Sequence, residues 1–132
     1  RNPIDSEIRE LFENINHSVF EYVGQNYKKQ IVFKDYIHDK KIILGKDAII
    51  PPFVEGDVFI GRFLMGKENA FLLSGMCFLP KQIKSLLKKQ AKKIRKTQNP
   101  EEEMKYLLRL ESLKTKWHRY GHVDPEKIFC FE

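Results

Sequence analysis

Residues 56–66 have the sequence GDVFIGRFLMG, in which a Gly-Asp pair and a final glycine enclose a mainly apolar run. A run rich in β-branched and aromatic residues between turn residues is typical of a strand. Gly61 falls inside this run, as Gly75 does in a later one, and glycine within a strand usually marks a bulge or a sharp bend. The segment therefore predicts a strand over residues 58–65 that bends at Gly61.

The same alternation of short apolar runs and turns extends from residue 30 to residue 80. Pro51 and Pro52 cannot donate ladder hydrogen bonds, so they mark a break or an edge in this region. The other strand-forming runs are residues 31–33, 36–37, 42–44, 48–50, 70–73 and 76–79. Strands repeated at this short spacing predict a small antiparallel β-barrel or curled sheet, of the SH3 or OB type.

Helical periodicity flanks this β core on both sides. Residues 1–24 predict an amphipathic helix, because apolar side chains recur every three or four positions and Gly24 supplies a stop. Residues 81–120 predict an antiparallel helical hairpin, since residues 99–103 combine a capping Asn, a first-turn Pro and three glutamates. The short apolar run at 127–132 predicts one more strand, which makes the fold class α+β.

Length and composition place the chain among globular proteins. Its 132 residues suit a single domain, and ten Phe, five Tyr and one Trp can form a hydrophobic core. Cys77 and Cys130 lie far apart in apolar runs, which favours buried reduced thiols over a disulfide. With neither a membrane span nor a signal peptide in the sequence, we expect a cytoplasmic protein. A start at Arg1 rather than Met is compatible with an excerpt of a longer protein.

Part of the β region resembles a known family. The runs that carry the resemblance are Asp35-Tyr36-Ile37, residues 56–62, Leu73-Ser74-Gly75 and Leu79-Pro80. From about residue 32 to residue 80 the chain resembles a β-rich segment of uncharacterised bacterial proteins that often also carry a SEC-C zinc motif. That motif is absent here. The resemblance implies a bacterial-type cytoplasmic protein and transfers no catalytic residue.

The charge pattern is the most distinctive feature of the sequence. The net charge is +6, and no acidic residue occurs from Asn69 to Pro100. The basic residues of the predicted helix 81–96 are candidates for non-specific contact with the phosphates of RNA or DNA. They are Lys81, Lys84, Lys88, Lys89, Lys92, Lys93, Arg95 and Lys96. The open alternative is that residues 101–103 and Glu111 of the next helix neutralise them.

A second hypothesis concerns the aromatic seam of the hairpin. Tyr106, Trp117 and Tyr120 recur with leucines at spacings of three and four, as in a coiled coil. An exposed seam would make the chain a protein-interaction or regulatory domain, with a protein partner or a homodimer as its complex. The phenylalanines of the β region could stack on bases, although core packing is the simpler explanation for them.

Catalytic and metal-binding patterns are weak. His118, His122 and Cys130 have metal-ligand spacing, but Gly121 breaks the helix between the histidines, so we predict neither a metal site nor a cofactor. Asp35 with Asp39, and Glu55 with Asp57, are carboxylate pairs in turn-like contexts, and His17 and His38 are isolated. The sequence therefore favours a non-enzymatic binding module, without excluding an active site assembled in space.

Overall fold

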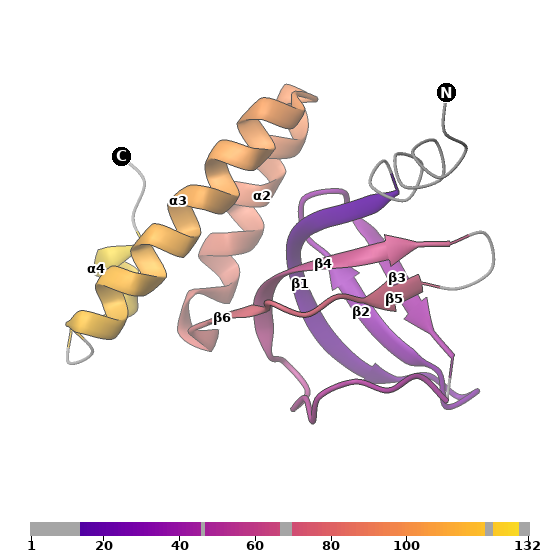
Figure 1. Ribbon diagram of the computed structural model, residues 1–132. Coiled ribbons are helices and arrows are strands. Elements are labelled where there is room, and N and C mark those ends of the chain that lie inside the picture. The colour runs from indigo at the N-terminus through magenta and orange to yellow at the C-terminus, as the bar shows by residue number, and fades with distance from the viewer. Residues whose placement is uncertain (1–13, 46, 67–69, 121–122, 130–132) are drawn as a thin grey trace, which may run out of the picture.

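The computed structural model describes residues 14–45, 47–66, 70–120 and 123–129. Within them a curled sheet stands beside a pair of long helices (Figure 1). The strands are β1 (Ile15–Gln25), β2 (Ile31–Asp35), β3 (Lys40–Leu44), β4 (Val58–Met65), β5 (Ala70–Leu72) and β6 (Cys77–Leu79). The helices are the 3₁₀ turn η1 (Lys81–Ile83), α2 (Lys84–Thr97), α3 (Pro100–Arg119) and α4 (Pro125–Ile128).

The sheet is antiparallel and strongly curled. Its strand order is β3-β2-β1-β4-β5. Strand β6 pairs with the first residues of β4, and β5 pairs with its last residues. Among the described residues β3 and β5 are not paired with each other, so the sheet is an open half-barrel rather than a closed barrel of the SH3 or OB type. The α+β class and the curled antiparallel sheet are thus confirmed, whereas the finer fold assignment is not supported.

Both faces of this sheet are buried, and each has its own core. The concave side holds a cluster of rings that includes Phe20, Phe33, Phe59 and Phe63, all fully buried. The rings of Phe20 and Phe63 meet edge to face with centroids 4.7 Å apart, a favourable arrangement for aromatic pairs. The convex side packs against the helices, and there Val19, Val58 and Ile60 join Leu87 and Leu110. This explains why β4 is apolar on both sides of the strand.

The prediction of an N-terminal helix through residue 24 is wrong for its second half. Residues 15–25 form β1, the central strand, while residues 1–13 lie outside the described residues. Ile15, Val19 and Val23 are spaced by four, and four is a multiple of the strand period as well as close to a helical turn. The spacing therefore fits both structures. Gly24, predicted as the helix stop, has φ of 119° at an irregularity in the β1–β2 register.

Three further predictions need correction. Strand β2 continues through Asp35, so Tyr36 and Ile37 belong to the turn that follows it rather than to a strand. Residues 48–50 form no strand. The predicted strand 127–132 begins instead within the helical turn α4, because Asp124 accepts a hydrogen bond from the Glu126 amide and Pro125 occupies the first helical position, and residues 130–132 lie outside the described residues.

The helical hairpin is confirmed. Helix α2 ends at Gln98, which adopts a left-handed conformation, and Asn99 caps α3 by accepting a hydrogen bond from the Glu101 amide at 2.9 Å. Pro100 stands at the first position of α3 and three glutamates fill its first turn, as the sequence predicted. No helix in the described parts of the chain is both long enough and apolar enough to cross a membrane.

Candidate nucleic-acid interface

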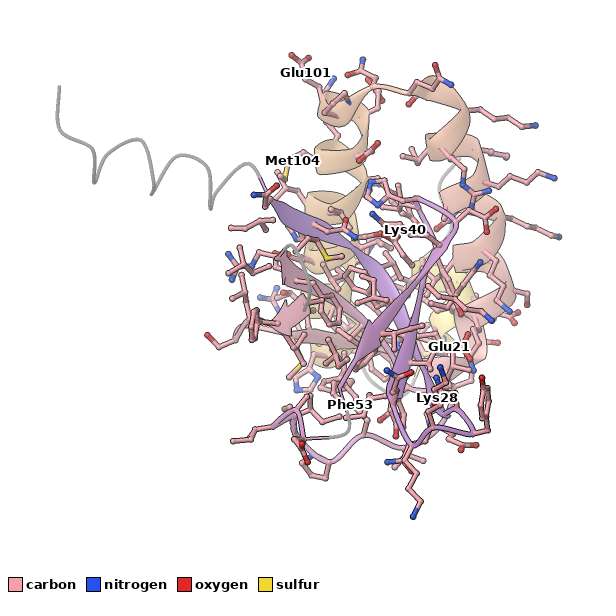
Figure 2. The ribbon with its side chains drawn as sticks, turned by 90° about the vertical axis from the view of Figure 1, so that its right-hand side faces the viewer. Glu21, Lys28, Lys40, Phe53, Glu101 and Met104 are labelled. Carbon is pink, nitrogen blue, oxygen red and sulfur yellow. The ribbon has the colours of Figure 1, made fainter. Side chains whose placement is uncertain are left out.

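The basic residues of α2 lie on the side of the helix that faces away from the core. Ile83, Leu87 and Ala91 are fully buried against the sheet and α3, which leaves the opposite side of the helix exposed. Figure 2 shows nitrogen-tipped side chains extending from α2 into open space, on the side away from α3. The position of the core stripe therefore decides where the lysines point.

Three of the eight basic residues hold the helix against the sheet. The Lys81 ammonium lies 3.1 Å from a carboxylate oxygen of Asp57, and that of Lys84 lies 3.5 Å from Glu21. Arg95 donates to two carbonyl oxygens of the turn after β2, at 2.9 Å from Nε to Ile37 and 2.6 Å from Nη2 to Tyr36. These three residues have a structural task, so they are poor candidates for contact with a ligand.

The other five basic residues form an exposed surface that we call the lysine face. It consists of Lys88, Lys89, Lys92, Lys93 and Lys96. No carboxylate of the described residues forms an ion pair with any of them. The ammonium of Lys88 lies over the Tyr36 ring, 5.7 Å from its centroid. Five solvated cations on 14 residues of helix form a dense positive field.

The glutamates at the start of α3 turn away from this surface. Glu103 accepts a hydrogen bond from the His38 ring at 2.9 Å, and Glu102 lies 3.6 Å from Lys105 of its own helix. Within the described chain no ion pair joins a lysine of α2 to a carboxylate of α3. Neutralisation of the lysine face by α3, the alternative that the sequence left open, therefore has no direct contact to support it.

Glu103 belongs instead to a polar cluster built around Asp35, which is fully buried at the end of β2. One carboxylate oxygen of Asp35 accepts hydrogen bonds from the Ser18 hydroxyl at 2.5 Å and from the His38 amide at 3.1 Å. The other accepts from Asn16 Nδ2 and from His38 Nδ1, both at 2.8 Å. The chain Asp35–His38–Glu103 thus connects the half-barrel to α3.

Electrostatics favour a charged cluster. Burial alone would raise the pKa of Asp35, but the hydrogen bonds from His38, Ser18 and Asn16 outweigh it and hold that pKa below its usual value. The hydrogen bond to Asp35 raises the pKa of His38 against the opposing effect of burial, and Glu103 adds to the rise. Because a carboxylate only accepts, each ring nitrogen of His38 needs a proton to make its bond.

This cluster holds the turn after β2, and its polar groups bond to one another. Both ring nitrogens of His38 are occupied, and the hydroxyl nearby, that of Ser18, donates to Asp35. The carboxylate pair of Asp35 and Asp39 weighed from the sequence does not form: Asp39 binds Lys34 at 2.7 Å instead. The three-residue spacing of Asp35 and His38 at the end of a strand is the sequence signal that could have indicated this cluster.

The aromatic seam is mostly part of the core. Tyr106 is buried and its hydroxyl donates to Gln90 Oε1 at 2.9 Å, which removes it from the candidates for partner binding. Trp117 is half-buried against the helical core, with the Lys114 ammonium 5.7 Å from its ring centroid. Its buried Nε1 has no hydrogen-bond partner among the described residues. Tyr120 is more exposed than Tyr106 and Trp117, with 46% of its surface in solvent.

The remaining candidates contribute little to a site. His118 is exposed on α3, whereas His122 and Cys130 lie outside the described residues. No group of His, Cys, Asp or Glu side chains in the described ranges could hold a metal ion. Cys77 is a free, half-buried thiol, and burial raises its pKa. Among the phenylalanines of the β region, Phe59 and Phe63 are fully buried and offer no surface for a base, whereas Phe71 and Phe78 are 55% and 39% exposed.

Comparison of the chain with protein-family models, with curated proteins and with solved structures returns no match. Its function therefore has to be argued from the surface itself.

Proposed function

We propose that this protein is a non-enzymatic binding module that contacts nucleic-acid phosphates through the lysine face. The observation that carries the proposal is that Lys88, Lys89, Lys92, Lys93 and Lys96 have no carboxylate partner among the described residues. An ammonium group without an internal partner keeps its full charge for an external phosphate. The carboxylates of Asp57, Glu21 and Asp39 pair with Lys81, Lys84 and Arg95, so none of these three offsets the charge of the lysine face.

The residue types favour contact without sequence reading. Lysine acts on a phosphate as a point charge, whereas arginine is the usual reader of guanine edges. The one arginine of α2, Arg95, is held by the Ile37 and Tyr36 carbonyls. Lys88, Lys92 and Lys96 are spaced by four, which places them about 6 Å apart along the helix axis. The lysine face would therefore follow a phosphate backbone over about 12 Å of helix.

Salt dependence tests the proposal. Neutralising five phosphates of duplex DNA gives a slope of about −4.5 in a plot of log affinity against log salt concentration. The affinity should therefore fall about 500-fold when the salt concentration rises from 50 to 200 mM. Fluorescence anisotropy with a labelled 20-base-pair duplex and a single-stranded RNA measures this slope. A triple variant, K89A/K93A/K96A, should flatten the slope by about three units. The matched control K28A/K116A/K127A removes the same charge from exposed lysines elsewhere.

Two results would overturn the proposal. One is the absence of binding to either probe at 50 mM salt. The other is an equal loss of affinity in the K89A/K93A/K96A variant and in the control, since this would reduce the effect to net charge.

The alternative, a protein-interaction or regulatory domain, is supported by exposed apolar groups on α3. Met104 and Leu108 are one turn apart and 44% and 56% exposed, and Tyr120 is exposed further along the helix. Such a patch would bind a partner or a second copy of the chain, and mass measurement in solution at rising concentration tests for the second copy. The resemblance of residues 32–80 to the bacterial segment described above supports a bacterial, cytoplasmic setting as part of the proposal.

A further inference from the structure

A cleft of about 360 Å³ lies beside the lysine face, between α2 and the hairpin formed by β2 and β3. Its charged lining comes from both walls. Lys34 and Lys41 stand on the hairpin, and Lys88, Lys92 and Arg95 stand on α2. Two carboxylates, Glu21 and Asp39, complete the set. Five cations less two anions leave the cleft with three uncompensated positive charges.

Both carboxylates already have partners inside the protein. Glu21 accepts a hydrogen bond from the Tyr36 hydroxyl at 2.5 Å and lies 3.5 Å from the Lys84 ammonium. Asp39 binds Lys34 at 2.7 Å and lies 3.7 Å from Arg95 Nη1. They therefore do not neutralise the remaining cations of the cleft, which are Lys41, Lys88 and Lys92.

Two of the cleft lysines lie next to each other on the hairpin wall. Lys41 lies directly opposite Lys34 in the register of β2 and β3, where like charges repel, and the ion pair of Lys34 with Asp39 offsets part of that repulsion. On the opposite wall the Tyr36 ring, under Lys88, fixes the place of one ammonium group. Positive charge is thus concentrated from two separate elements into one concave space, which an open lysine-rich surface does not require.

We propose that this cleft is a binding site for a compact phosphate dianion or polyanion, such as a diphosphate or a terminal phosphate. Ammonium groups converging from two walls suit an anion with several charged oxygens, because each lysine can donate to a different oxygen. Arg95 adds positive charge but no bidentate pair of hydrogen bonds to the anion, since its Nε and Nη2 donate to backbone carbonyls. The inference goes beyond the proposed function, because one wall of the cleft comes from β2 and β3 and the cleft shares only Lys88 and Lys92 with the lysine face.

Inorganic pyrophosphate is the first probe. Its binding is measured at low salt by calorimetry and by changes of backbone amide shifts in NMR spectra. We expect binding to the wild-type chain, with shifts gathered on β2, β3 and α2. Lys41→Ala should weaken binding about tenfold, the effect of losing one charge-assisted hydrogen bond. Lys40→Ala is the matched control on the same strand, because neighbouring strand residues point to opposite faces, and it should stay within about twofold.

Two RNA oligonucleotides of one sequence, with a 5′-phosphate and with a 5′-hydroxyl, identify the source of the phosphate. Tighter binding of the phosphorylated RNA, lost in Lys41→Ala, assigns the cleft to a chain end. Pyrophosphate binding without that preference assigns it to a free diphosphate group. Equal affinity of Lys41→Ala and wild type for pyrophosphate, or no binding of pyrophosphate at 1 mM (about −4 kcal/mol), overturns the inference. If the proposed function is wrong and this inference is right, the wild-type chain binds pyrophosphate but does not bind RNA.

Discussion

The substitution Asp35→Asn tests how the turn after β2 is held. It preserves the shape of the side chain and replaces one carboxylate oxygen with an NH₂ group. The carboxylate accepts four hydrogen bonds, from Ser18, Asn16, and both the amide and the ring of His38. Whichever way the amide of the new side chain is turned, two of these four hydrogen bonds lose their acceptor oxygen.

The magnitude follows from these contacts. Hydrogen bonds to a charged group contribute roughly 1.5–3 kcal/mol each, so loss of two gives about 3–5 kcal/mol. Asp35 is fully buried, hence solvent cannot replace the lost acceptor. For a chain of this length a loss of that size lowers the melting temperature by roughly 10–20 °C.

The pH dependence gives a second readout. Because the pKa of His38 is raised above 6.5 in the folded state, the stabilisation is complete below pH 6.5 and is lost as pH rises through the folded-state pKa. The pKa of Asp35 is lowered below 3.8, so its contribution is lost as pH falls through the folded-state value. The difference between wild type and Asp35→Asn should be largest between pH 3.8 and 6.5.

Urea unfolding of both proteins across this pH range measures the difference directly. The burial that lowers the pKa of His17 affects both proteins equally, so it cancels. The control is Asp39→Asn, which removes an exposed carboxylate from the same turn and should leave the midpoint nearly unchanged. If Asp35→Asn is no more destabilising than this control, or if its effect is the same at every pH, the account of the cluster is wrong.

Three further substitutions test other parts of the structure by thermal unfolding. Gly61→Ala would place a methyl group 2.7 Å from the Phe59 ring, which is buried in the concave core. We expect the free energy of unfolding to fall by about 2–3 kcal/mol. A change below about 0.5 kcal/mol would contradict this. Arg95→Ala removes two hydrogen bonds to backbone carbonyls and should cost about 2 kcal/mol, with the turn after β2 losing amide protection first. Lys41→Ala relieves the repulsion with Lys34, so the melting temperature should stay or rise without phosphate present, and a clear fall would argue against that repulsion.

Much of the fold could be predicted because the local signals were unambiguous. The turn residues around residues 58–65 fixed β4, and the Asn99-Pro100 pair fixed the start of α3. The strand β1 could not be identified in the same way, since an apolar spacing of four satisfies a helix and a strand equally. Its burial on both faces, by Val19 on one side and Phe20 on the other, exists only in the assembled sheet.

The candidate sites divide along the same line. The basic character of α2 was plain from the sequence, but which lysines are occupied was not. That depends on Asp57, Glu21 and Asp39, which lie 24 to 63 positions before their partners in the chain. The Asp35–His38–Glu103 cluster was missed because Glu103 is 65 positions from His38, and no local pattern encodes such a contact. The cleft depends on the position of α2 against the β2–β3 hairpin.

The central position of β1 has a consequence for synthesis of the chain. This strand is made before the other described strands, yet its partner on one side, β4, begins only at Val58. Until then a nascent chain can form only the meander of β1, β2 and β3, with the other edge of β1 unpaired and Phe20 uncovered on the β4 side. An unpaired apolar edge is a template for association between chains. A chain that ends before residue 58 would therefore be more prone to aggregate than one that ends after residue 65.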